Sequence, residues 1–252
     1  MVDAIESENL SEHLLELNSL LMRASIALVL ISILWSPFID NLIQIWIENL
    51  PIQTGPSNEN MSVFGPYEWI QVRWGLLLLL SLTTLLPLLS IQIYRFSRPG
   101  LYPSEKNWLS SVLLLTTTII PFAIFSIWHW GLPFLFDFAT RYGTPDGVLV
   151  RYDAPSIFSL AIGISWVLIV WSVTTISLSL TRVFGLLEDG NSRFRFRLIA
   201  ISASILILTL PVEFDGLRII ATFLVVYSSD SISKSAPVVF PSGQILPNDT
   251  RT

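Results

Sequence analysis

Residues that commonly carry out catalysis are few in this sequence and lie far apart. The chain has no cysteine, which excludes disulfides, thiolate metal ligands and cysteine nucleophiles. The two histidines, His13 and His129, are too distant in sequence to provide the short spacing of a zinc-binding pair. His129 also stands between Trp128 and Trp130, which is typical of an aromatic belt at a membrane interface. The sequence therefore predicts no enzyme, no catalytic residue, no metal site and no cofactor.

Hydroxyl groups are the main polar groups within the longest apolar stretches. Ser172, Thr174 and Thr175 lie inside one of these stretches. In a membrane helix, such side chains most often bond neighbouring carbonyl groups or hold helices together. Glu213 stands at the end of a shorter apolar stretch, where a turn in water is the simplest interpretation.

The composition indicates an integral membrane protein. Of 252 residues, 52% are hydrophobic and only 13% are charged, about half the charged share of an average soluble domain. The net charge of −5 argues against binding to nucleic acid, which needs a basic surface. Residues 1–16 contain acidic residues and no lysine or arginine, so they do not read as a cleavable signal peptide. We expect the first hydrophobic stretch to stay in the protein as a membrane anchor.

Six apolar stretches predict an all-α protein with six transmembrane helices. The uncharged runs are 24–39, 74–94, 107–136, 154–181, 198–212 and 219–229. A spanning helix needs about 20 mostly apolar residues, and the last two runs are shorter than that. They predict two short, tilted spans, with a re-entrant hairpin as the alternative.

Lysine and arginine residues predict the orientation of these spans. On one side of the membrane lie Arg23, Arg95, Arg98, Lys106, Arg182, Arg193, Arg195, Arg197, Lys234 and Arg251. On the other side lie Arg73, Arg141, Arg151 and Arg218. This imbalance places both termini in the cytoplasm. Residues 1–234 then form one membrane domain, and 235–252 read as a disordered cytoplasmic tail. Residues 41–50 predict an amphipathic helix at the outer interface, with Trp46 at that level.

Two polar segments stand out on the predicted cytoplasmic side. The first is His13-Leu14-Leu15-Glu16-Leu17-Asn18, just before the first span. The second runs from Gln92 to Lys106, between the second and third spans, and contains Gln92, Tyr94, Phe96, Pro99, Leu101, Tyr102, Glu105 and Lys106 at defined spacings.

These segments resemble the TatC family, the multi-spanning receptor subunit of twin-arginine protein translocases. The family opens with His-Leu-x-Glu-Leu-Arg, and its first cytoplasmic loop reads Gln-x-Trp-x-Phe-x-x-Pro-x-Leu-Tyr-x-x-Glu-Arg. Tyr94 replaces the tryptophan and Lys106 the final arginine of the loop pattern. The resemblance also implies six spans with short fifth and sixth helices and both termini in the cytoplasm.

Several departures from the family pattern indicate a divergent member, archaeal in style. Asn18 stands where the family has arginine, and the glutamate of the fourth span is missing in a region that reads Val173-Thr174-Thr175. Glu213 replaces an aspartate after the fifth span, and Asp230 corresponds to the glutamate that ends the sixth. A TatC-like scaffold that no longer exports proteins is therefore one alternative. A small-molecule transporter or permease subunit is the other, although the charged midplane helices typical of transporters are absent from the sequence.

The resemblance implies a binding site for signal peptides that carry two consecutive arginines. Glu16 and Glu105 are the expected partners of the two guanidinium groups, since arginine pairs best with a carboxylate. Phe96 and Tyr102 are expected to line an apolar floor, with Gln92, Pro99 and Lys106 completing the site.

The resemblance also implies partners and an energy source. The expected partners are single-span TatA- and TatB-like proteins, further copies of the chain within a complex, and folded cargo proteins exported by means of the proton gradient. With the fourth-span glutamate missing, we expect Ser172, Thr174, Thr175 and Glu213 to contact a partner helix.

Overall fold

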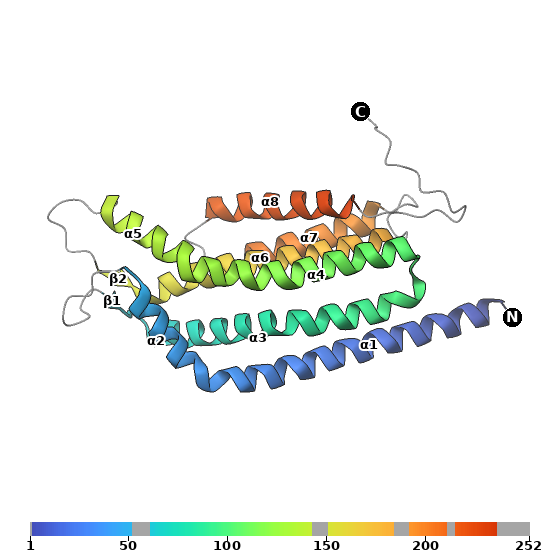
Figure 1. The fold of residues 1–252 in the computed structure, drawn as a ribbon, viewed down its shortest axis with the longest axis horizontal. Coiled ribbons are helices and arrows are strands. Elements are labelled where there is room, and N and C mark those ends of the chain that lie inside the picture. The colour runs from blue at the N-terminus through green and yellow to red at the C-terminus, as the bar shows by residue number, and fades with distance from the viewer. Residues whose placement is uncertain (1, 52–60, 143–150, 184–191, 211–214, 236–252) are drawn as a thin grey trace, which may run out of the picture.

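A computed structural model describes residues 2–51, 61–142, 151–183, 192–210 and 215–235. The described chain is an elongated bundle of long helices that lie side by side (Figure 1). The helices are α1 (Val2–Trp35), α2 (Ile39–Asn49), α3 (Pro66–Ser97), α4 (Pro103–Ser126), α5 (Leu132–Tyr142), α6 (Ala154–Val183), α7 (Ser192–Thr209) and α8 (Asp215–Ser233). The all-helical membrane fold expected from the apolar stretches is confirmed.

Four continuous helical segments are long and apolar enough to cross a membrane. They are Asn18–Asn49, Tyr67–Ser97, Pro103–Tyr142 and Ala154–Arg182. The last two helices, α7 and α8, have 18 and 19 residues. At 1.5 Å per residue each is about 27–29 Å long, slightly short of the ~30 Å hydrocarbon core. Among the helices that contain the six apolar runs, α7 and α8 are therefore the shortest, as the lengths of their runs predict.

The first helix differs from its prediction at both ends. It begins at Val2, well before the apolar run, and ends at Trp35, where a short 3₁₀ turn over Ser36–Phe38 contains Pro37. After this turn α2 runs away from the axis of α1 (Figure 1). The predicted helix over 41–50 is therefore present, and the first candidate span, Asn18–Asn49, bends at the turn that contains Pro37.

Helix α6 lies at the centre of the bundle, where it contacts α3, α4, α7 and α8. Its 30 residues include Phe158, Ala161 and Leu178, all buried completely or nearly so. The core therefore surrounds α6, while α1 packs mainly on α3 and keeps most of its other surface exposed.

An aromatic cluster fixes α2 against the core at one end of the bundle. The helical path of α4 continues through a π-helical turn, Ile127–Gly131, before α5 begins. The Trp46 indole donates a hydrogen bond to the Trp128 carbonyl oxygen over 2.8 Å, and the Trp128 indole donates to the Ser165 hydroxyl over 2.8 Å. Both rings pack on Phe158. Trp46 is therefore packed into the core of the bundle and does not lie on its exposed surface.

A short parallel pairing closes the same end. Strand β1 (Met61–Ser62) pairs with β2 (Tyr152–Asp153), which leads directly into α6. This pairing holds the start of α3 beside the start of α6.

Candidate functional site

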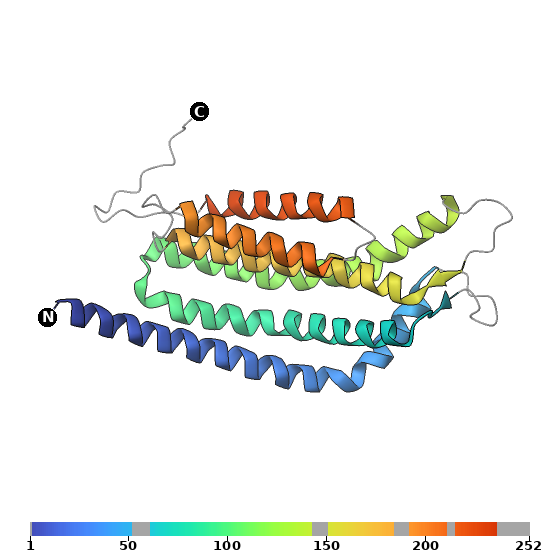
Figure 2. The same cartoon turned by 180° about the vertical axis from the view of Figure 1, so that it is seen from behind.

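The two polar segments singled out in the sequence lie at the same end of the bundle. The start of α1 and the link between α3 and α4 are both at this end, opposite to α2, α5 and the strands (Figures 1 and 2). The end of α8 lies there too. We call this end the link end, after the α3–α4 link over residues 98–102.

The α3–α4 link is held firmly in place. A 3₁₀ turn, Arg98–Gly100, follows α3 directly, and α4 begins with Pro103. Between them Leu101 is buried in a cluster with Leu109, Leu113 and Ile176. Because Ile176 belongs to α6, this contact ties the link to the central helix. The proline-rich segment is therefore a rigid surface feature.

Glu105 lies in the first turn of α4, where its carboxylate caps the helix. Its Oε2 accepts a hydrogen bond from the backbone N–H of Tyr102 over 2.9 Å, as in a capping box. The side chain is only 4% exposed, and an acidic group here also interacts favourably with the helix dipole. Among the described residues, no donor reaches Oε1, so the carboxylate keeps acceptor capacity.

The other predicted loop residues surround this carboxylate in sequence and differ in exposure. Tyr102 is 51% exposed and Pro99 is also exposed, whereas Phe96 and Lys106 are half-buried. Gln92 is half-buried, and its side-chain carbonyl oxygen is buried without a hydrogen-bond donor.

Two residues need separate comment. Glu16 lies near the middle of α1, and its side chain is outside the described residues. Ser97 was not singled out by sequence reasoning, although it stands within the polar segment. Its hydroxyl is fully buried and has no hydrogen-bond partner in the described part of the chain, so it is a second unsatisfied polar group beside the link.

The hydroxyl residues of α6 face the inside of the bundle. Thr174 donates to or accepts from Ser202 of α7 at 2.8 Å, and Thr175 bonds Ser229 of α8 at 3.1 Å. Ser172 is completely buried, and no described residue bonds its hydroxyl. These side chains hold helices of this chain together, so a partner helix would not reach them in this arrangement. Glu213 lies outside the described residues.

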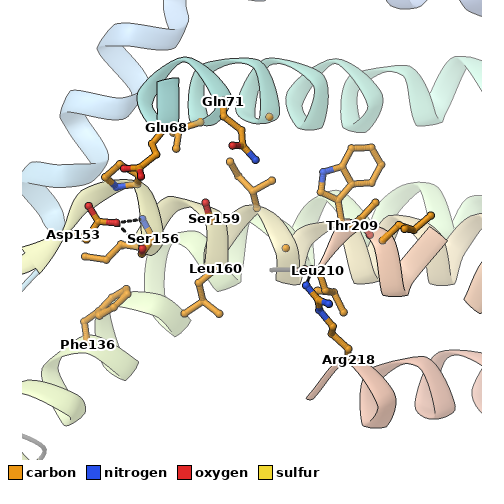
Figure 3. Close-up of a pocket in the computed structure, with 18 residues that line it drawn as sticks. Glu68, Gln71, Phe136, Asp153, Ser156, Ser159, Leu160, Thr209, Leu210 and Arg218 are labelled. Carbon is orange, nitrogen blue, oxygen red and sulfur yellow. Dashed lines mark hydrogen bonds between the residues drawn. The ribbon is translucent and has the colours of Figure 1, made fainter. Parts of the chain in front are cut away.

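A cavity of about 760 Å³ opens at the other end of the bundle (Figure 3). Residues of α3, α5, α6, α7 and α8 line it, among them Glu68, Gln71, Ser159, Trp166, Thr209 and Arg218. Asp153 also lines it; one of its oxygens caps α6 through the Ser156 backbone N–H, and the other, Oδ1, is buried without a partner. The cavity therefore combines carboxylates on one side with a guanidinium on the other.

The lengths of the helices explain this cavity. With 30 residues, α6 is about 45 Å long, some 16–18 Å longer than α7 or α8. Both shorter helices stop before the end of α6 that carries β2 (Figure 1). The first turns of α6 are therefore not covered by α7 or α8, and the cavity lies beside these turns, beyond the ends of the two shorter helices.

An ion-pair cluster joins three helices at the link end. Asp230 of α8 accepts from Arg182 of α6 at 3.1 Å, from Arg195 of α7 at 2.6 Å and from Lys234 at 2.9 Å. Arg182 also donates from Nε to Ser233 over 2.9 Å. Asp230 is 8% exposed, so its charge is satisfied mainly by these cations. Sequence reasoning placed Asp230 near the end of the last span but gave no sign of its partners.

A bundle of long apolar helices with a rigid polar link at one end and a polar cavity at the other defines a polytopic helical membrane protein. The sequence model of one family, described as Sec-independent protein translocase protein (TatC), matches residues 12–221. The chain belongs to the TatC family, which confirms the resemblance seen in the sequence.

Individual relatives agree with this assignment. A Sec-independent protein translocase protein TatC from Methanocella arvoryzae is 27% identical over 54% of this chain and 54% of its own length. Proteins of the same name from Rickettsia prowazekii and Haemophilus influenzae are 23% and 24% identical, over 55% and 63% of their lengths. The chain thus matches a little over half of the length of these curated relatives.

The fold is also that of a solved structure. A crystal structure described as the twin arginine translocase receptor TatC superimposes with a TM-score of 0.62 at 20% sequence identity. The match covers 89% of this chain and 99% of that one. A second crystal structure of TatC, in the detergent DDM, gives a TM-score of 0.61.

Proposed function

We propose that this protein is the receptor subunit of a twin-arginine translocase. It binds signal peptides with two consecutive arginines at the link end, which faces the cytoplasm, and takes part in the export of folded proteins driven by the proton gradient. Family membership and the buried, incompletely satisfied carboxylate of Glu105 beside the rigid link support this proposal.

The proposed topology has six spans with both termini in the cytoplasm. The distribution of lysine and arginine in the sequence supports this orientation, since ten of these residues fall on the predicted cytoplasmic side and four on the other. The helices α7 and α8 serve as the two short spans, with local thinning of the bilayer to match their length.

The chemistry of the link suits a guanidinium ligand. An arginine side chain has five N–H donors and no acceptor. Glu105 uses Oε2 for the Tyr102 N–H, which leaves Oε1 for a ligand. The Gln92 carbonyl oxygen and the Ser97 hydroxyl also lack partners among the described residues, but both are buried, so a ligand reaches them only if the link moves. A charge-assisted hydrogen bond to the carboxylate contributes about 1.5–3 kcal/mol. Lysine binds less well, because an ammonium group cannot make the planar two-pronged contact.

Glu16 supplies the second carboxylate in this proposal. It lies in α1, whose N-terminal part reaches the link end (Figure 1). Phe96 and the exposed Tyr102 provide apolar contacts for the hydrophobic part of the signal peptide, with Pro99 and Lys106 at the edge of the same surface.

The cavity is the proposed docking face for a single-span partner of the TatA or TatB kind. We propose the cavity as the contact for a partner helix instead of Ser172, Thr174 and Thr175, because those three side chains are buried inside the chain's own bundle. The cavity is lined by Gln71, Ser159 and Thr209, which offer hydrogen bonds to a polar residue of a partner helix. A complex with several copies of the chain is part of the same proposal.

Photo-crosslinking in membrane vesicles tests the peptide site. Signal peptides with Arg-Arg and with Lys-Lys are compared on the protein itself and on Glu16→Ala, Glu105→Gln and Glu48→Gln variants. We expect selective labelling by the Arg-Arg peptide, lost in the Glu16 and Glu105 variants. Glu48 is an exposed carboxylate on α2 at the opposite end, so its variant is the control. Equal labelling by both peptides would favour a TatC-like scaffold that does not bind signal peptides.

A further inference from the structure

Among the described residues, the ion-pair cluster at the ends of α6, α7 and α8 carries more positive charge than its carboxylate neutralises. Arg182, Arg195 and Lys234 all pair with the single carboxylate of Asp230. Three cations and one anion leave a formal excess of two positive charges in the cluster. Lys234 is four residues after Asp230 on the same chain segment, so it is not needed to join the helices.

Two of these cations remain accessible. The side chains of Arg195 and Lys234 are 41% and 56% exposed, whereas that of Arg182 is 21% exposed. A guanidinium has five donors and an ammonium three, so one carboxylate cannot occupy them all. The Nε of Arg195 is buried without an acceptor among the described residues, so only the outer N–H groups of this side chain can reach a ligand. The cluster therefore keeps free donor capacity that points to an additional anion.

The start of α7 adds to this positive field. Arg195 lies in the first turn of α7, which contains no acidic residue. The unpaired N–H groups at a helix N-terminus carry a partial positive charge of about half a unit. A basic residue is normally unfavourable at this position, and a bound anion would offset the repulsion.

The expected position of the cluster relative to the bilayer favours a phospholipid as the source of the anion. At about 45 Å, α6 is as long as a bilayer including its headgroup regions. Arg182 lies in the last turn of α6, so the cluster is at the level of the lipid headgroups. Basic pockets between helix ends at this level suit phospholipid phosphates.

We propose that Arg182, Arg195 and Lys234 form a binding site for the phosphate of an anionic phospholipid. Asp230 holds the three cations together, while Arg195 and Lys234 direct their remaining donors to the phosphate. The excess positive charge favours a lipid with a net negative charge over a zwitterionic one. This site is separate from the proposed signal-peptide surface and does not depend on it.

Native mass spectrometry of the full chain released from detergent micelles tests the site. Equal amounts of phosphatidylglycerol and phosphatidylcholine are added, and the retained lipid is measured for the protein and for Arg195→Gln, Lys234→Gln and the double variant. A basic residue near an anionic membrane contributes enough to change affinity about fivefold. We expect preferential retention of phosphatidylglycerol, weakened about fivefold by each single change and more by both.

Arg197→Gln is the matched control, because Arg197 is an exposed arginine on the same helix outside the cluster. Glu188 and Asp189, in the α6–α7 connection outside the described residues, stay unchanged in every variant. Equal retention of both lipids, or equal loss in the Arg197 variant, would overturn the proposal. A third arm adds inorganic phosphate; if it displaces phosphatidylglycerol at equal concentration, the site takes soluble phosphate and not a lipid. The exposed Lys234 variant tests the proposal even if the Arg195 variant folds poorly.

Discussion

Replacing Asp230 by asparagine tests whether the three-helix ion cluster stabilises the fold. The substitution keeps the size of the side chain but removes the only negative charge among three cations. Arg182, which is mostly buried, then loses its negatively charged partner and keeps an uncharged amide oxygen beside it and the hydrogen bond to Ser233.

The expected cost follows from the burial of these groups. Removing one partner of a buried ion pair typically costs 3–5 kcal/mol. Arg195 and Lys234 are exposed enough to regain water, so most of the loss comes from Arg182. We therefore expect a loss of about 3 kcal/mol in the free energy of unfolding, at the low end of that range.

Equilibrium unfolding in mixed detergent micelles measures this loss. A double-mutant cycle with Arg182→Gln isolates the contribution of the pair, and we expect a coupling of about 1–2 kcal/mol. The control is Asp40→Asn, which breaks the exposed Arg73–Asp40 pair at the opposite end and should cost at most about 1 kcal/mol. If the Asp230 variant lost no more than the Asp40 variant, the stabilising role of the cluster would be refuted.

Three further predictions concern stability in the same unfolding assay. Glu105→Ala should cost about 1 kcal/mol through loss of the cap on α4, while Glu105→Gln should cost less because an acceptor remains; equal losses would contradict the capping role. Phe158→Ala should cost about 3 kcal/mol or more, because the ring is buried against three tryptophans, and a loss below about 1 kcal/mol would show that the cluster repacks. Thr175→Val should cost about 0.6 kcal/mol through loss of the bond to Ser229, whereas Ser172→Ala should be nearly neutral because its hydroxyl has no partner; the reverse order would refute this assignment.

Most of the architecture could be predicted from the sequence, because a chain surrounded by lipid can adopt few backbone structures. A long uncharged run in a membrane protein must satisfy its backbone groups internally and therefore forms a helix. The runs 74–94, 107–136 and 154–181 each fall inside helical segments of the structure. The shortness of α7 and α8 was visible as well, since charged residues limit both runs.

Features that depend on contacts between distant residues could not be predicted. Trp46 lies on an amphipathic helix, where a tryptophan exposed at the membrane interface is the usual expectation. In the structure its indole instead bonds the Trp128 carbonyl oxygen in a π-helical turn 82 residues away, and the side chain is buried in the core. In the same way, the neighbouring sequence does not show whether a hydroxyl group contacts a helix of another protein or, as Thr174 does with Ser202, a helix of its own chain.

The candidate site was predictable in part for the same reason. Glu105 stands in a long ordered motif, and its place at a proline-stiffened helix start follows from the sequence alone. The unsatisfied hydroxyl of Ser97 and the partners of Asp230 depend on how helices pack, which no motif records.

The affinity of a twin-arginine signal peptide for the purified protein in lipid nanodiscs tests the central claim most directly. Titrations compare the Arg-Arg peptide with its Lys-Lys counterpart, on the protein and on the Glu105→Gln variant. Loss of a charge-assisted bond worth about 1.5–3 kcal/mol corresponds to a 10- to 150-fold weaker affinity. For the Arg-Arg peptide, we predict that the Glu105→Gln substitution weakens the affinity by a factor in this range. For the Lys-Lys peptide, we predict that the same substitution changes the affinity little. Equal affinity of the protein and the variant for the Arg-Arg peptide would contradict the proposed role of Glu105 as its receptor carboxylate.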